Sequence, residues 1–204
     1  MSEPPKIFRD SIMARALREY FEKLEARLQL KTPMQVWIAG GMAVNLYTGI
    51  RPTDDIDAEF SRRVVIPNDI MVNVSLEGRA TDRIWFDHNY NPMFALMHED
   101  YQVDAIPLHF GLVDLEIFVL SPSDLVLSKI GRFSDVDQDD IRSLSRLVDE
   151  VEIERRAREA LVAYPGSTAM IEYNLRDAIA IIREARAKHA GGNNPGDADP
   201  PVST

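Results

Sequence analysis

The stretch 37–60, WIAGGMAVNLYTGIRPTDDIDAEF, constrains the fold of this 204-residue chain more than any other. An apolar run, Val36–Ala39, leads into it and suits a buried strand, and Gly40–Gly41 then breaks the run. Apolar residues recur at helical spacing after the glycines, and Gly49 is a suitable helix C-cap. The pattern predicts a strand, a tight glycine turn and a short helix.

Two aspartates, Asp55 and Asp57, follow the predicted helix. Side chains alternate along a strand, so two acids one residue apart point to the same face. Beside a glycine turn at a helix N-terminus they make a plausible site for a divalent metal and phosphate. Taken alone, an Asp-x-Asp pair is more often part of a solvated strand edge. The hypothesis therefore rests on the pair together with the strand, the glycine turn and the helix that precede it.

A metal site of this kind needs a third carboxylate, and Asp104 is the best candidate. It interrupts the apolar segment Tyr101–Pro107, which we expect to be a strand. A buried acid is costly unless it is paired or bound to metal. The alternative is that Asp104 meets an arginine or lies at a strand end. Asp114 and Glu116 flank a turn and are weaker rivals.

The rest of the chain has an N-terminal helix, a middle part with several short strands and few helices, and a C-terminal run of amphipathic helices, which predicts an α/β (α+β) fold. Ser121-Pro122 suits a helix start, with serine as N-cap. We expect strands over 70–76, 83–86, 101–107 and 115–120, and helices over 7–30, 124–133, 136–151, 153–163 and 169–189. We assign residues 1–120 to a core, 121–190 to a C-terminal helical part and 191–204 to a disordered tail rich in Gly, Pro, Asn and Asp.

Composition narrows the chemistry and the partners. There is no cysteine, and the four histidines show no zinc-ligand spacing, which leaves Mg²⁺ as the expected metal. No apolar run is long enough for a membrane span, and the N-terminus lacks the apolar core of a signal peptide, so we expect a cytoplasmic protein without a membrane partner. The net charge of -10 argues against nucleic acid as main partner unless a local basic face or a bound metal offsets it.

The motif order also resembles a known family. Gly40-Gly41, a spacer and Asp55-Ile56-Asp57 resemble the signature of the nucleotidyltransferase superfamily, which has the polymerase-beta-like fold. The fuller string, with Ala43, Leu46 and Arg51-x-Thr53, is similar to the bacterial branch linked to toxin–antitoxin systems and abortive infection. A downstream segment over 120–141, Leu-Ser-Pro-Ser-Asp-Leu followed by Lys129, Arg132, Asp137 and Asp140, resembles the same proteins. The resemblance covers roughly residues 36–145.

The resemblance implies a nucleotidyltransferase-like mixed sheet flanked by helices and a role for each matching residue. It implies that Gly40 and Gly41 contact nucleotide phosphates and that Asp55 and Asp57 bind Mg²⁺ or Mn²⁺, with Asp104 as our choice for the third acid. Many active relatives have Gly-Ser at this turn, and this chain has Gly-Gly, as does the toxin-like branch.

Four further residues complete the expected site. Lys129 matches a phosphate-binding lysine, and Asp140 matches an acid that supports the site in some relatives. Arg51 or Thr53 would replace the missing serine hydroxyl. Without the family, Lys129 is an ordinary lysine on an amphipathic helix, and Arg51 simply pairs with Asp54.

The implied activity is metal-dependent transfer of a nucleoside monophosphate from ATP or another NTP to an acceptor hydroxyl on RNA, tRNA or protein. Asp55, Asp57, Asp104 and Lys129 would be the catalytic residues, and a cognate toxin or antitoxin a further partner. Two alternatives stay open: a non-catalytic toxin–antitoxin protein whose acidic surface covers a basic partner, and a transferase for small molecules such as aminoglycosides.

Overall fold

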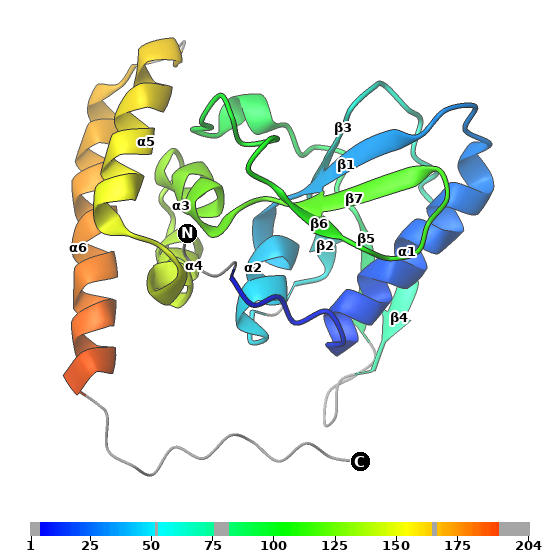
Figure 1. Ribbon diagram of the computed structural model, residues 1–204, viewed down its shortest axis with the longest axis horizontal. Helices are drawn as coiled ribbons and strands as arrows, with labels where there is room; N and C mark the ends of the chain where they lie inside the picture. Colours follow the sequence, from blue (N-terminus) through cyan, green and yellow to red (C-terminus); the bar gives the residue numbers. More distant parts are fainter. Residues whose placement is uncertain (1–4, 52, 76–81, 165–166, 192–204) are drawn as a thin grey trace.

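The molecule has a four-stranded and a three-stranded sheet, which lie to the right in Figure 1, and the last helices of the chain stand at the left. The computed structural model describes residues 5–51, 53–75, 82–164 and 167–191. In chain order the elements are α1 (Ile12–Leu28), β1 (Met34–Ile38), α2 (Gly40–Thr48), β2 (Asp55–Ile56), β3 (Ala58–Phe60), β4 (Val72–Val74), β5 (Asp82–Phe86), the 3-10 helix η1 (Pro92–Phe94), β6 (Ile106–Leu108), β7 (Leu115–Val119), α3 (Pro122–Ile130), α4 (Asp135–Leu144), the 3-10 helix η2 (Ser145–Leu147), α5 (Glu150–Ala163) and α6 (Ala169–Gly191). The predicted α/β class is confirmed.

Strand β1 is central in the larger sheet, whose order is β3-β1-β7-β6. Its neighbours are β7, which runs parallel with Val36 opposite Ile117, and β3, which runs antiparallel with Ile38 opposite Ala58. All of β1 except Gln35 is buried, as a strand covered on both faces requires. The smaller sheet has the order β2-β5-β4, with β2 and β5 parallel.

The helices begin where the sequence offers a cap. The hydroxyl of Ser11 accepts a hydrogen bond from Ala14 N–H at the start of α1, and Ser121 does the same for Asp124 N–H in α3. Helix α4 has a full capping box, because Ser134 and Asp137 each accept from the other's backbone N–H. Helices α3 and α4 pack against each other and against both α2 and α6, while α5 and α6 stand side by side at the left of Figure 1.

Several predicted elements differ in extent from the observed ones; the helix expected over 7–30, for example, spans only Ile12–Leu28. Two differences are larger. The expected strand 101–107 is mostly a turn, closed by Asp104 N–H donating to Asp100 O, and only Ile106–Leu108 forms β6. The expected helix 136–151 ends at Leu144, and Val148 is extended. The reason is local: the carboxylate of Asp149 accepts from the N–H groups of Val151 and Glu152, which starts a new helix, α5.

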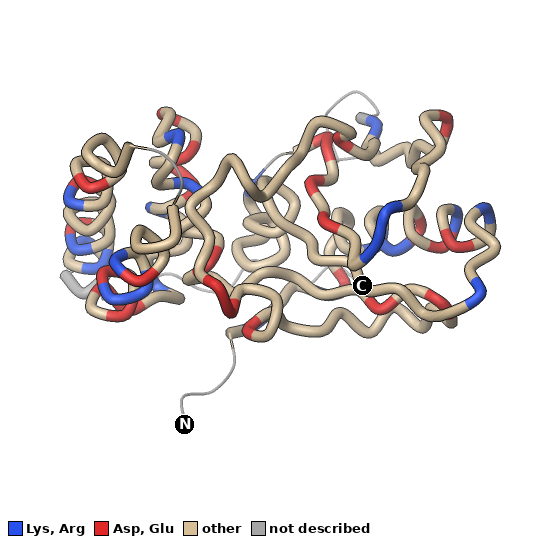
Figure 2. Tube along the Cα trace, turned by 90° about the horizontal axis from the view of Figure 1, so that it is seen from above, with Lys and Arg blue, Asp and Glu red and all other residues tan. Residues whose placement is uncertain are grey.

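The arginines of α5 divide into two kinds. Arg155 and Arg158 form exposed ion pairs with glutamates of the same helix, as the alternating sequence suggests. Figure 2 shows this interleaving of acidic and basic residues along the C-terminal helices. Arg156 is instead buried, and it bridges Asp104 at 2.7 Å and Asp124 at 2.8 Å. It therefore joins the C-terminal helices to the core.

Two other expectations concern membrane-spanning helices and the division of the chain into parts. No helix within the described ranges combines the length and apolar character needed to cross a bilayer. The division of the chain at residue 120 stays a prediction, and residues 192–204 of the predicted tail lie outside the described part of the chain.

Candidate active site

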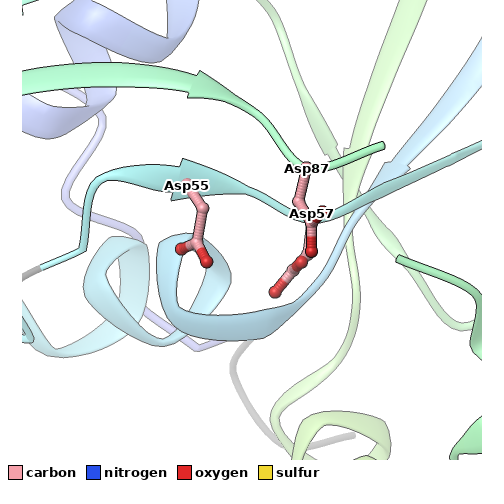
Figure 3. Close-up of side chains that lie close together, drawn as sticks. All are labelled: Asp55, Asp57 and Asp87. Carbon is pink, nitrogen blue, oxygen red and sulfur yellow. The ribbon is translucent and has the colours of Figure 1, made fainter. Parts of the chain in front are cut away.

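Three carboxylates meet where the parallel strands β2 and β5 end (Figure 3). Asp55 lies on β2, Asp57 follows that strand, and Asp87 follows β5. The ladder sets their register, because Trp85 N–H donates to Asp54 O at 2.9 Å and Asp87 N–H donates to Ile56 O at 3.0 Å. One carboxylate oxygen from each aspartate lies within 4.8 Å of the others. Three half-buried carboxylates at this spacing suit a hard divalent cation such as Mg²⁺.

The glycine turn packs directly on this group. Gly40 has a φ of +59°, a backbone conformation that favours glycine, and a Cβ there would lie 1.7 Å from Asp57 Oδ2. The Ala39 N–H donates to Asp57 O at 2.9 Å, which holds the turn to the aspartate from the other direction. The N-cap of α2 is Ala39, whose methyl side chain cannot accept a hydrogen bond. The first N–H groups of α2 therefore begin next to the carboxylates.

Thr53 and Arg51 lie on the Asp55 side of the turn. The Thr53 hydroxyl donates to Asp55 Oδ1 at 2.7 Å and so fixes one carboxylate of the group. A Cβ on Gly41 would meet Thr53 Oγ1 at 2.9 Å and Arg51 Nη2 at 3.3 Å. The structure thus brings Gly41, Arg51 and Thr53 together beside Asp55.

Asp140 connects this turn to the helix that carries Lys129. Its Oδ1 accepts from Arg51 Nε at 2.7 Å, and its Oδ2 lies 3.0 Å from Lys129 Nζ. Asp140 is only 1% exposed and Lys129 only 7%, so both charges are out of bulk water and compensate each other. The alternative that Lys129 merely extends into solvent is thereby excluded, and Arg51 pairs with Asp140.

A second buried acid, Asp137, orders the adjoining arginine. Arg132 donates two hydrogen bonds of 2.7 Å to its carboxylate, one from Nε and one from Nη2. Burial alone would raise the pKa of Asp137, but these bonds and those from Ser134 lower it to about 2. Arg132 is thereby held where its charge reaches Asp57.

We expect Asp137→Asn to destabilise the protein by about 1–2 kcal/mol at pH 7. Because the folded pKa is depressed, the ionised carboxylate stabilises the fold above pH 4, and that contribution is lost as pH falls through about 2. Urea unfolding of wild type and variant at pH 7 and near pH 2 measures the difference. Asp139→Asn, at an exposed position of the same helix, is the matched control, and an equal loss in both variants would contradict the assignment.

The surroundings of Asp57 disfavour its charged form. Burial, then the neighbouring charge of Asp55, raises the pKa of its carboxyl from an ordinary 3.8 to about 6, with a further contribution from Asp87. Lys129 and Arg132 act in the opposite direction and do not compensate fully. Crowded carboxylates of this kind favour a cation among them, which agrees with the geometry of the group.

The raised pKa predicts that Asp57→Asn stabilises the metal-free protein. Because the folded pKa is raised, protonated Asp57 stabilises the fold, and this contribution is fully present below pH 4. It is lost as pH rises through about 6, so the free energy of unfolding of the wild type is lower above pH 6. We expect the variant to gain about 1–3 kcal/mol at pH 7.5 in EDTA and nothing at pH 4. Thermal or urea unfolding measures this. Asp54→Asn, which removes an exposed charge from the same segment, should show no such pH dependence.

The structure places the predicted third acid elsewhere. Asp104 lies in the turn before β6, where its carboxylate pairs with Arg156, and it does not join Asp55 and Asp57. This matches the alternative that Asp104 meets an arginine. Asp87 takes its place in the group, and sequence reasoning missed it. Its signal was a carboxylate directly after the predicted strand 83–86, in line with the end of the Asp55 strand.

Comparison with known proteins agrees with this geometry. Searches of curated proteins and of solved structures found no match. A family model described as "Nucleotidyltransferase of unknown function (DUF6036)" matches residues 15–175, a range that includes the glycine turn, all three carboxylates, Lys129 and Asp140. Because that match spans well over half of the 204 residues, this chain belongs to the DUF6036 family of nucleotidyltransferases.

Proposed function

We propose that the protein is a metal-dependent enzyme that transfers a nucleoside monophosphate from an NTP to an acceptor hydroxyl. The observation that carries the proposal is the convergence of Asp55, Asp57 and Asp87 against the N-terminus of α2. Asp87 replaces Asp104 as the third carboxylate of the proposal. Mg²⁺ or Mn²⁺ held by these three residues would neutralise phosphate charge and lower the pKa of the acceptor hydroxyl.

The chain's own groups would hold the triphosphate. The N–H groups of Gly40 and Gly41 have the positive end of the α2 dipole behind them and suit phosphate oxygens. Lys129 and Arg51 supply positive charge on the same side, and Asp140 positions both of them. Thr53 would fix the orientation of Asp55 through its hydrogen bond and would not itself contact a phosphate.

The reaction follows from this placement. The acceptor oxygen attacks the α-phosphorus and forms a new O–P bond, and the bond from that phosphorus to the bridging oxygen of pyrophosphate breaks. A carboxylate oxygen of Asp57 or Asp87 accepts the hydroxyl proton. Positioning and electrostatic stabilisation supply most of the rate in such a transfer.

The test is incubation of the purified protein with each labelled NTP, Mg²⁺ and cell RNA or lysate. Label should appear on an acceptor with wild type and fall to background with Asp57→Ala. Equal labelling by both proteins, or none by either, would contradict the proposal. The NTP and the lysate fraction that give label identify donor and acceptor class in the same experiment.

A toxin–antitoxin role is a second proposal, supported by the string of Gly40-Gly41, Arg51-x-Thr53 and Asp55-x-Asp57 and by the net charge of -10. An acidic surface suits a basic protein partner.

Toxicity of the expressed chain, relieved by co-expression of a neighbouring gene, tests the enzymatic version. A stoichiometric basic partner captured by a chain that binds no Mg²⁺–NTP would instead indicate a non-catalytic member. Loss of aminoglycoside sensitivity on expression would indicate a small-molecule transferase.

A further inference from the structure

A cavity of about 690 Å³ is lined by residues that neighbour the carboxylates in the chain, although the three carboxylates themselves do not line it, and the proposed function assigns nothing to it. Two of its lining residues, Ala58 and His88, directly follow Asp57 and Asp87 in the chain. Tyr90 lines it as well, and the charge of Asp57 acts on the Tyr90 hydroxyl, whose pKa burial raises first. The cavity therefore begins within one residue of two of the three carboxylates.

Aromatic rings line this cavity. Phe86 contacts Phe60 and His88 edge to face, with ring centroids 5.7 and 5.2 Å apart. Phe94, on η1, belongs to the same lining and is 82% exposed, so its ring has little protein contact of its own. Flat aromatic surfaces open to solvent are the groups on which nucleic-acid bases stack.

The cavity lining carries more basic than acidic side chains, although the chain as a whole has a net charge of -10. Glu59 is its one carboxylate among the described residues, and it already accepts a hydrogen bond from the Tyr101 hydroxyl. Arg62 donates to the carbonyls of Thr32 and Pro33. Arg63 is exposed and makes no hydrogen bond or ion pair with any described residue. One arginine at the mouth is thus available to an anion.

Gly40, Gly41, Arg51 and Lys129, the proposed phosphate-binding residues, do not line this cavity. Gly41 packs against Thr53 and Arg51, and Arg51 shares Asp140 with Lys129. The cavity instead continues from Asp57 and Asp87 along β3 and the segment after β5. A donor triphosphate held by those residues leaves the cavity to the acceptor.

We propose that this cavity is the acceptor pocket and that the acceptor is a nucleotide, with its base stacked on the aromatic rings, its phosphate at Arg63 and its hydroxyl at the carboxylates. The inference rests on the proposed function, because it takes the carboxylates as the reaction centre. It disfavours an aminoglycoside acceptor, since two arginines would repel a polycation. The nucleotide is either free or the 3′ end of a single strand, which have the same chemistry at this pocket.

The test measures binding without NTP, so that it does not depend on turnover. A 5′-fluorescein hexanucleotide RNA with a free 3′ hydroxyl is titrated with the full chain and Mg²⁺, and anisotropy gives Kd. We expect Phe94→Ala to weaken binding about tenfold, the effect of losing one stacked base. Arg63→Ala should weaken binding several-fold at low salt and reduce the slope of log Kd against log salt by about 1.

Two exposed positions outside the cavity are the matched controls. Tyr173→Ala removes an exposed ring from α6, and Arg146→Ala removes an exposed arginine from η2; both should bind as wild type does. Displacement of the probe by unlabelled mononucleotide at matched concentration identifies a free nucleotide, and displacement only by longer strands identifies a 3′ end.

Three results would overturn the pocket assignment: no RNA or mononucleotide binding by wild type, equal weakening by cavity and control variants, or loss of NTP affinity instead of RNA affinity in Phe94→Ala. None of these three results depends on whether the wild type transfers label, which is measured separately. A failed transfer assay with normal RNA binding would instead count against the proposed reaction alone.

Discussion

Gly40→Ala is expected to reduce nucleotidyl transfer by about 10²-fold or more while leaving most of the protein folded. The added Cβ would lie 1.7 Å from Asp57 Oδ2, closer than any non-bonded contact allows. The nearest atom belongs to a side chain, so the carboxylate can move away, and that movement takes it out of the group with Asp55 and Asp87. The variant also places alanine at a φ of +59°, which costs roughly 1–2 kcal/mol.

Two other glycines separate these effects. Gly111 has a φ of +77° and an open Cβ position, so Gly111→Ala has the backbone strain without the clash. Gly131 has an ordinary φ, and a Cβ there would make contacts no closer than 3.7 Å. We expect Gly111→Ala to lose stability and keep activity, and Gly131→Ala to keep both. Steady-state transfer rates and urea unfolding measure all three. Gly40→Ala activity within a few-fold of Gly111→Ala would show that the close approach to Asp57 is not needed.

The parts of the site that sequence reasoning located are those that lie close together in the chain. The strand, the glycine turn, helix α2 and Asp55-x-Asp57 occupy one stretch, and each element has its own local signal: an apolar run, two glycines, a helical period and Gly49 at +72° as C-cap. Ser121-Pro122 likewise marks the start of α3. Local propensity and capping decide such elements with little help from tertiary contacts.

The third carboxylate could not be located in this way, because it depends on strand register. Asp87 joins the group only because β5 pairs in parallel with β2, a contact across about thirty residues of chain. The apolar residues around Asp104 were misleading for a related reason. Val103 is 82% exposed, and Tyr101 is turned toward Glu59, so apolar composition there reflects a surface turn and not a buried strand.

A second contact between distant parts of the chain, the ion pair with Arg156, explains the role of Asp104. The buried Arg156 needs carboxylate partners, and it takes one from Asp124 on α3 and one from Asp104 on the turn before β6. An acid inside an apolar segment can thus compensate a charge from a helix that follows fifty residues later. Sequence spacing alone cannot separate this arrangement from a metal ligand, since both satisfy a costly carboxylate.

Paired substitutions at Asp87 and Asp104 therefore discriminate between the two assignments of the third ligand. Asp87→Asn removes one negative charge from the group of three and should reduce Mg²⁺-dependent transfer by about 10²–10³-fold. Asp104→Asn should leave the rate within a few-fold of wild type and instead lower stability by roughly 1–2 kcal/mol, because Arg156 loses an ion-pair partner that is 39% exposed. Mn²⁺ binding followed by electron paramagnetic resonance gives a readout besides activity: weaker in Asp87→Asn, unchanged in Asp104→Asn. The reverse ranking, with metal affinity lost at position 104 and kept at 87, would return the third ligand to the turn before β6.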